Sequence, residues 1–147
     1  MGVKVVNIPD TNVAVELYLF DCAGQPIFNQ LDHMSKHWDN TAQVMVCFDV
    51  SSRDSFASCA KWLQGVRATR PANPIGGVLL ANKIDLRENG RGVVESSEGV
   101  EFASANGLEY FECSALQGTQ VEEPFNFVAN EFYKKYEETV GHAEDLA

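Results

Sequence analysis

The tetrad Asn82-Lys83-Ile84-Asp85 places an amide, a cation and a carboxylate directly after an apolar run. The carboxylate of Asp85 can accept two hydrogen bonds, and guanine offers a matching donor pair at N1 and its exocyclic amine. Adenine does not present that pair. Asn82 could tie the base to the loop, and the apolar stem of Lys83 could cover its face. An ordinary strand-to-loop turn with an Asp cap would account for the same residues, so the tetrad alone leaves both readings open.

A second pattern, Asp21-x-x-Gly24-Gln25, closes another apolar run. The carboxylate of Asp21 could hold Mg²⁺ through a water molecule, and Gly24 could offer its backbone N–H to a terminal phosphate. Gln25 could act catalytically by orienting the water that attacks this phosphate. Asp-x-x-Gly alone is weak, because chance supplies it in roughly half of chains of average composition. Its value lies in its position before the tetrad.

The third pattern is Ser114-Ala115, which follows a further short apolar run. A backbone N–H at this point could donate to O6 of guanine. Taken in order, the three patterns indicate a site for GTP or GDP with Mg²⁺, divided between guanine recognition and phosphate chemistry.

Strands and helices must bring these patterns together. Apolar runs predict an antiparallel hairpin at the start of the chain, followed by strands that alternate with helices from residue 42 onward. Such alternation favours right-handed crossovers and a parallel sheet. Ligands bind outside the carboxyl ends of such strands, where Asp49 also lies. The predicted strands are Lys4–Ile8, Val15–Phe20, Ala42–Val50, Gly77–Asn82 and Leu108–Glu112, and the predicted helices are Ser55–Arg70, Glu95–Asn106 and Val121–Val140.

Each predicted helix has an apolar face or a recognisable end. Pro71 and Pro74 end the first helix, and Gly107 stands where a C-cap glycine belongs. The last helix is aromatic on more than one face, so its surplus aromatics, Phe127 or Tyr136, could form a protein interface. We expect Phe56, Cys59, Leu63 and Val66 to face inward from the first helix, and Val121, Phe125, Val128 and Phe132 from the last.

Composition narrows the function classes. The 147 residues, 45% of them hydrophobic, fit one domain over residues 1–140 with an acidic tail at 141–147. A net charge of −10 opposes binding to nucleic acid. No run approaches the ~20 apolar residues of a membrane span, and no signal peptide or myristoylation signal is present. The four scattered cysteines predict reduced thiols, and His33 with His37 lack a third metal ligand nearby.

The chain resembles the Ras superfamily of GTPases over nearly its whole length. The resemblance rests on Phe20–Gln25, the tetrad and Glu112–Ala115, with Rab-like features at Phe48–Ser51 and Lys61–Leu63. It implies an α/β fold of the P-loop NTPase type, a three-layer sandwich whose mostly parallel sheet carries an antiparallel edge hairpin. It also implies GTP/GDP and Mg²⁺ as cofactors and slow GTP hydrolysis.

The chain departs from this family pattern in three places. It contains no Gly-x-x-x-x-Gly-Lys-[Ser/Thr] motif, so the first strand, the phosphate-binding loop and the first helix of the family are not found. We therefore expect an N-terminally shortened GTPase, or a pseudo-GTPase. Its last residues carry no prenylatable Cys, which implies no direct lipid anchor. Pro26 follows Gln25 where most Rabs have an acidic residue, and Phe20-Asp21-Cys22 replaces the usual Trp-Asp-Thr.

Within the superfamily, the chain is most similar to the Rab-like GTPases of intraflagellar transport (the Rab-like 4 type). The resemblance lies in Pro9–Thr11, Val15–Asp21, Ser58–Leu63 and Glu123–Phe125. It implies a subunit of intraflagellar transport complex B in the cytoplasm and the cilium or flagellum, paired with a small β-sandwich subunit. The alternatives are a rigid, non-cycling subunit of a transport complex and an ordinary Rab-type regulator of vesicle traffic.

Overall fold

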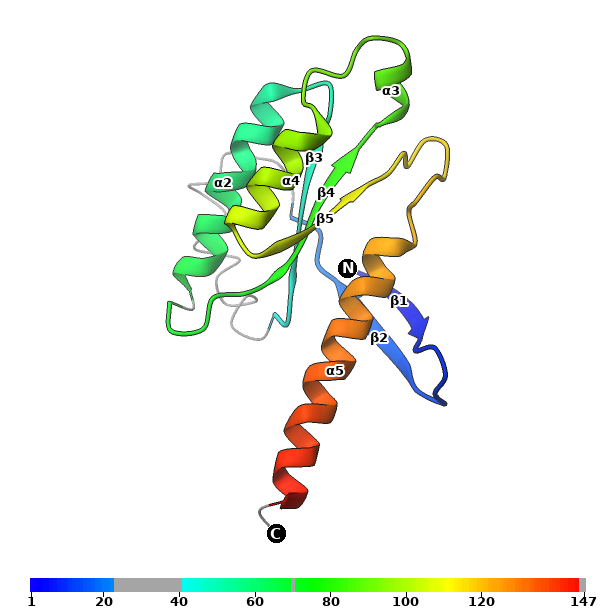
Figure 1. The fold of residues 1–147 in the computed structure, drawn as a ribbon, viewed down its shortest axis with the longest axis vertical. Coiled ribbons are helices and arrows are strands. Elements are labelled where there is room, and N and C mark those ends of the chain that lie inside the picture. The colour runs from blue at the N-terminus through cyan, green and yellow to red at the C-terminus, as the bar shows by residue number, and fades with distance from the viewer. Residues whose placement is uncertain (23–40, 70, 146–147) are drawn as a thin grey trace. The chain divides into compact units, whose positions relative to one another are not determined.

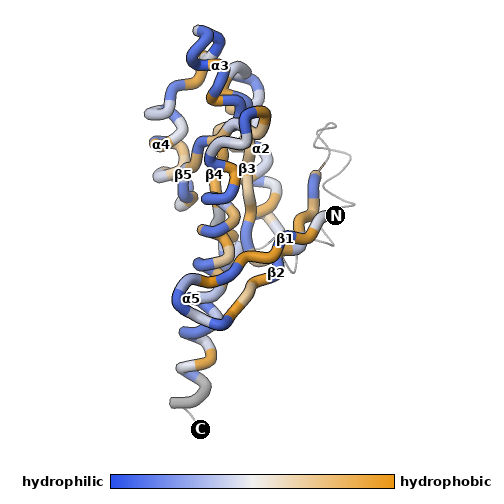
Figure 2. Tube along the Cα trace, turned by 90° about the vertical axis from the view of Figure 1, so that its right-hand side faces the viewer, coloured by the Kyte–Doolittle hydropathy of each residue, from blue (hydrophilic) through white to orange (hydrophobic). Residues whose placement is uncertain are grey.

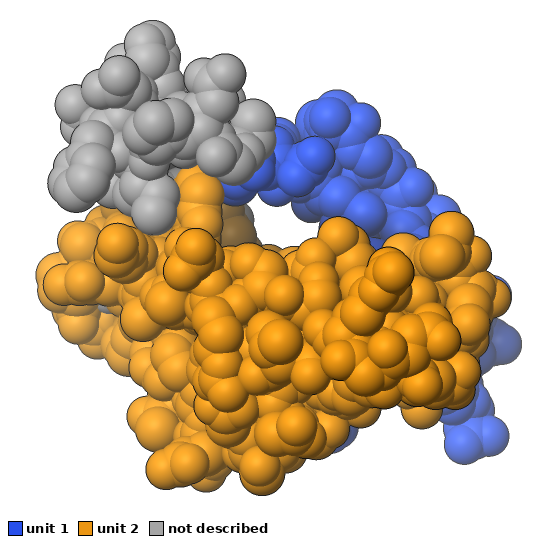
Figure 3. All heavy atoms as spheres, turned by 90° about the horizontal axis from the view of Figure 1, so that it is seen from above, with its two compact units in different colours: residues 1–23, 122–147 blue, residues 24–121 orange. Residues whose placement is uncertain are grey.

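A computed structural model describes residues 1–22, 41–69 and 71–145, with the side chains of 143–145 left out (Figure 1). The chain divides into two compact units, which are described separately. One unit is formed by Met1–Ala23 with Glu122–Ala147, and the other by Gly24–Val121 (Figure 3). The predictions for Gly24, Gln25, Pro26, His33 and His37 fall outside the described residues.

The sheet of the second unit is parallel, as predicted. It consists of β3 (Val44–Asp49), β4 (Gly77–Asn82) and β5 (Leu108–Glu112) in the order β3-β4-β5 (Figure 1). The register pairs Asp49 with Asn82 and Ala81 with Glu112. The carboxyl ends of the three strands therefore meet at one edge of the sheet, and the loops that follow them lie close together.

Helices α2 (Arg53–Ala68) and α4 (Ser96–Ala105) connect these strands. Helix α2 begins two residues earlier than predicted, because Ser52 caps it by accepting the backbone N–H of Ser55 at 3.2 Å. Helix α4 starts with a reciprocal capping box between Glu95 and Glu98. It is followed by Gly107 in the left-handed conformation at φ 64°, which confirms the predicted C-cap glycine.

The core of the second unit lies between the sheet and these two helices. Val46, Phe48, Leu79 and Ala81 from the strands pack with Cys59 and Leu63 from α2. Phe56 also packs against this cluster, 4.9 Å from Phe48 between ring centroids, and Val66 is buried in a separate cluster with Ile75. The predicted inward face of α2 is thus confirmed. Burial of these apolar side chains holds the strands, and therefore their ends, in place.

The first unit contains the predicted antiparallel hairpin. Strand β1 (Gly2–Asn7) pairs with β2 (Ala14–Leu19), and Val6 lies opposite Val15. Figure 2 colours much of both strands as hydrophobic. Helix α5 (Glu123–Asp145) packs one face on the hairpin, where Val6, Ile8 and Ala129 are buried with Phe125 and Tyr133 beside them.

Helix α5 corrects one prediction and extends another. Phe132, expected to face inward, is 44% exposed, while the small Ala129 is fully buried on the face that contacts the hairpin. The helix continues to Asp145, beyond the end predicted at Val140 and through part of the predicted acidic tail. Within the ranges that the structure describes, no helix is long and apolar enough to span a membrane.

Candidate functional site

The backbone links the three strand ends before any side chain contributes. The N–H of Val50 donates to the carbonyl oxygen of Asn82 at 3.1 Å, and the N–H of Cys113 donates to that of Ala81 at 2.8 Å. The N–H of Ile84 then donates to the carbonyl of Cys113 at 3.3 Å. The loops after β4 and β5 are therefore joined directly to each other.

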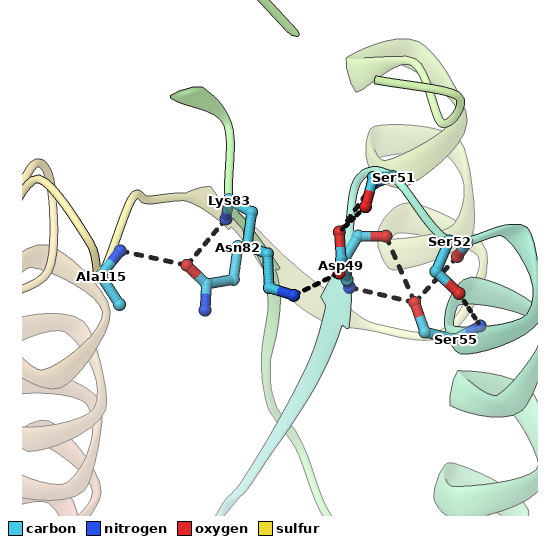
Figure 4. Close-up of polar contacts among 7 residues, drawn as sticks. All are labelled: Asp49, Ser51, Ser52, Ser55, Asn82, Lys83 and Ala115. Carbon is cyan, nitrogen blue, oxygen red and sulfur yellow. Dashed lines mark hydrogen bonds and ion pairs between the residues drawn. The ribbon is translucent and has the colours of Figure 1, made fainter. Parts of the chain in front are cut away.

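The side chain of Asn82 is the centre of the candidate site (Figure 4). Its Oδ1 accepts the backbone N–H of Lys83 at 2.7 Å and that of Ala115 at 3.1 Å. The thiol of Cys113 donates to the same oxygen at 3.5 Å. Lys83 has a left-handed backbone with φ 66°, which is strained for a residue with a side chain. The bond from its N–H to Asn82 helps to hold that conformation.

Asp85 is oriented by Ser114. The hydroxyl of Ser114, a fully buried residue, donates to Oδ1 of Asp85 at 2.5 Å. It also accepts the N–H of Gln117 at 3.2 Å, while the backbone of Ser114 exchanges two 3.0 Å hydrogen bonds with Thr119. A carboxylate offers about four acceptor positions. The single bond from Ser114 leaves acceptor capacity on Asp85 for the two donors of guanine, so the residue fits the predicted contact.

Lys83 forms an ion pair with Asp49 across the ends of β4 and β3, at 2.6 Å from Nζ to Oδ2 (Figure 4). Ser51 donates both its backbone N–H and its hydroxyl to Oδ1 of Asp49, at 2.8 and 2.6 Å. Partial burial opposes ionisation of Asp49, but the bonds from Lys83 and Ser51 outweigh it, so the pKa of Asp49 lies below its ordinary value. Asp49 is thus an oriented, ionised acceptor.

A second polar cluster joins the short helix α3 (Asp85–Glu88) to β5 and α4. Oε1 of Glu112 accepts bonds from Arg87 at 2.7 Å, Ser96 at 2.6 Å and Tyr110 at 2.7 Å. Burial opposes ionisation of Glu112, yet these three donors together lower its pKa. Burial and the nearby carboxylate raise the pKa of Tyr110 to about 12. The cluster braces the segments that carry Asp85 and Ser114.

The structure brings together the five predicted site residues that belong to the described part of the second unit. Asn82, Lys83, Asp85, Ser114 and Ala115 lie at one edge of the parallel sheet. Asp21 lies in the other unit and is exposed, while Gly24 and Gln25 are outside the described residues. Over residues 1–22, 41–69 and 71–145, no group of three or more acidic, His or Cys side chains could hold a metal ion.

Sequence reasoning did not predict two features of this edge. Asp49 was noted at a strand end but was given no role, and the cluster around Glu112 was not foreseen. A usable signal existed for Asp49, because adjacent parallel strands ending in Asp49 and Asn82 place Lys83 next to the carboxylate. A backbone N–H at Ser114-Ala115 was expected to meet O6 of guanine, and in the structure the N–H of Ala115 donates to Oδ1 of Asn82.

Comparison with known proteins gives a consistent result. The Ras family model matches residues 2–134. The human intraflagellar transport protein 27 homolog is 38% identical over 138 residues, covering 94% of this chain and 72% of that protein. Intraflagellar transport protein 27 of Chlamydomonas reinhardtii is 37% identical over 151 residues, covering 98% and 72%. The Ras-related protein Rab-2B of Dictyostelium discoideum is 34% identical over 140 residues, covering 95% and 66%.

Proposed function

This chain belongs to the Ras family, and we propose that it acts as a Rab-like GTPase of intraflagellar transport that binds GTP and GDP. Its parallel three-stranded sheet with an antiparallel hairpin is consistent with the Ras-like P-loop GTPase fold. The observation that carries the proposal is the side chain of Asn82, whose Oδ1 accepts backbone N–H groups from both loops around Asp85 and Ala115.

This arrangement supports recognition of guanine. The carboxylate of Asp85, oriented by Ser114, would accept hydrogen bonds from N1 and the exocyclic amine of the base. The apolar stem of Lys83 would cover one face. A contact from the N–H of Ala115 to O6 would require that N–H to be shared with, or released from, Asn82.

The phosphate chemistry is a proposal that rests on the family. Ras-family proteins in general bind Mg²⁺ with their nucleotide, and the ion would neutralise charge on the phosphates. Asp21 would hold this ion through water, Gly24 would contact the terminal phosphate, and Gln25 would orient the attacking water. Slow GTP hydrolysis would follow only where these groups meet a phosphate-binding loop, and the 147 residues contain no such motif.

The proposed setting follows the relatives named intraflagellar transport protein 27. We infer membership of complex B, pairing with a small β-sandwich subunit, and residence in the cytoplasm and the cilium or flagellum. Two other roles remain as alternatives. One is a non-cycling structural subunit of a transport complex, and the other is an ordinary Rab-type regulator of vesicle traffic, with which the similarity to the Ras-related protein Rab-2B agrees.

The guanine-nucleotide content of the purified chain, released by denaturation and measured by chromatography, tests the proposal. Near-stoichiometric GDP or GTP would support a nucleotide switch. A chain that is empty as purified should still bind added GDP if the guanine site is functional. A chain that binds none, even with a phosphate-loop segment supplied, would exclude the switch and leave the structural subunit.

The variant Asp85→Asn makes this test specific to the base. An amide N–H at this position can donate to the C2 carbonyl of xanthine, whereas it opposes the amine of guanine. We expect GDP affinity to fall by about tenfold or more, as a two-point base contact is worth ~1–3 kcal/mol, and xanthosine diphosphate affinity to rise. Unchanged preference for GDP would show that Asp85 does not read the base.

A further inference from the structure

The ion pair between Asp49 and Lys83 connects the guanine tetrad to a residue outside it. Asp49 and Asn82 are register partners at the ends of β3 and β4, so Lys83, the next residue, lies beside the Asp49 carboxylate. Nζ of Lys83 is 2.6 Å from Oδ2 of Asp49. The Lys83 side chain is 53% exposed and that of Asp49 22%. The lysine side chain is therefore about half open to solvent although its ammonium is held by Asp49.

The orientation of Asp49 is fixed from the opposite side, by the loop that enters α2 (Figure 4). Both donors of Ser51 bind Oδ1, which leaves Oδ2 directed toward Lys83. The backbone N–H of Asp49 donates to the hydroxyl of Ser55 at 3.0 Å, and this hydroxyl in turn donates to the carbonyl of Ser52 at 2.8 Å. Asp49 is thus a rigid acceptor rather than a surface carboxylate that happens to meet a lysine.

Lys83 is consequently held at both ends. Its backbone N–H is bound by Asn82, and its ammonium is bound by Asp49. A free lysine side chain would lose rotamer entropy on being ordered against a ligand. When the side chain is ordered beforehand, binding no longer includes that cost, which is the general benefit of preorganisation.

We propose that Asp49 is a positioning residue for guanine binding, which holds the ammonium of Lys83 so that the apolar stem is in place to cover the base. This inference rests on the proposed function. Asp49 does not touch the base in this scheme and acts only through Lys83. It differs in this respect from Asp85, which would read the donor pair of guanine directly.

A double-mutant cycle on Asp49 and Lys83 tests the inference. Asp49→Asn keeps an Oδ1 acceptor for Ser51 but replaces the oxygen that binds Lys83, and Lys83→Met keeps an apolar stem without the cation. Affinity for a fluorescent N-methylanthraniloyl derivative of GDP is measured for wild type, both single variants and the double variant. We expect each single variant to bind about two- to fivefold more weakly, the range of a partly exposed ion pair. The double variant should be no weaker than Lys83→Met.

The affinity for inosine diphosphate distinguishes the positioning role of Asp49 from a purely structural role. This nucleotide lacks the exocyclic amine that Asp85 would recognise. Asp49→Asn should weaken binding of GDP and inosine diphosphate by the same factor, because Lys83 covers a face that both bases share. Glu131→Gln is the matched control, because it removes the ion pair between Glu131 and Lys134 on helix α5 and should leave affinity unchanged.

The outcomes separate this inference from the proposed function. A wild-type chain that binds no guanine nucleotide overturns both. Nucleotide binding that is unchanged in Asp49→Asn overturns the inference alone. So does a loss of affinity from Asp49→Asn that is equally large in the wild-type chain and in the Lys83→Met variant. If thermal melting shows that Asp49→Asn does not fold, the Lys83→Met variant provides the test. Wild-type affinity in Lys83→Met would show that the lysine ammonium does not matter for binding, and it would overturn the inference.

Discussion

At the scale of single residues, Glu112 is a carboxylate that receives three donors on a single oxygen. Arg87, Ser96 and Tyr110 all bind its Oε1, and they stabilise the ionised form. A group whose pKa is lower in the folded than in the unfolded chain contributes stability above its unfolded pKa. That contribution is lost as the pH falls through the lowered, folded value. Glu112 should therefore make the protein sensitive to acid.

Glu112→Gln tests this expectation by urea unfolding between about pH 7 and pH 3. We expect the variant to lose about 1.5–3 kcal/mol at pH 7, the scale of hydrogen bonds to a charged group. The difference from wild type should shrink as the pH falls below about 4.3, the ordinary pKa of Glu. Glu101→Gln, an exposed change on α4, is the control. A difference that stayed constant down to pH 3 would contradict the assigned pKa direction.

The sequence predicted the residue types at this edge better than their pairings. The order of Asn82, Lys83 and Asp85 after a strand is visible in the amino-acid sequence itself, because these residues are neighbours in the chain. Which of 21 acidic residues meets Lys83 is not local, because it depends on the register between β3 and β4. The same holds for Ser114 and Asp85, whose bond joins segments after different strands.

At the scale of elements, the contact between β3 and β4 depends on Gly77. Its φ is 152°, and a Cβ built there would lie 1.9 Å from the carbonyl oxygen of Val44, a backbone atom. No side-chain rearrangement can relieve such an overlap. We expect Gly77→Ala to cost about 2–4 kcal/mol of unfolding free energy, in the range of other backbone-strain mutations.

Gly76→Ala is the matched control, because a Cβ at that position meets nothing within 4 Å. It should change stability by less than about 0.5 kcal/mol. Guanidinium unfolding of both variants under identical conditions provides the comparison. Similar stability of Gly77→Ala and Gly76→Ala would show that β3 and β4 can move apart easily at their amino ends.

The predicted helices and strands agree with the structure where one local sequence pattern determines the element. β4 and β5 have the predicted bounds because each is a short apolar run between turn residues. Helix α3 was not predicted, since four residues cannot show a helical period. The predicted inward face of α5 was partly wrong because it was assigned from the large apolar residues of the helix. The hairpin instead packs against Ala129, a small residue that permits close approach.

At the scale of the whole molecule, the apolar face of helix α5 continues beyond the part that packs against the hairpin. Phe125 and Ala129 contact the hairpin, and Tyr136 lies about three helical turns beyond Phe125 on the same face. Yet Tyr136 is 56% exposed, and Val140, one further turn along, is 37% exposed. An aromatic side chain that is amphipathic, exposed and continuous with an internal contact is typical of a protein interface.

We expect Tyr136→Glu to weaken assembly with the small β-sandwich subunit proposed as its partner. The new carboxylate would have to be desolvated in an apolar contact, which should reduce co-purification by about tenfold or more, as for an interface residue worth over ~1 kcal/mol. The fold should tolerate the change, because Tyr136 is exposed. Lys134→Gln also lowers the charge by one but lies about 200° away around the helix, and should leave recovery unchanged. Recovery of Tyr136→Glu equal to wild type, with an unchanged melting temperature, would remove this face of α5 from the interface.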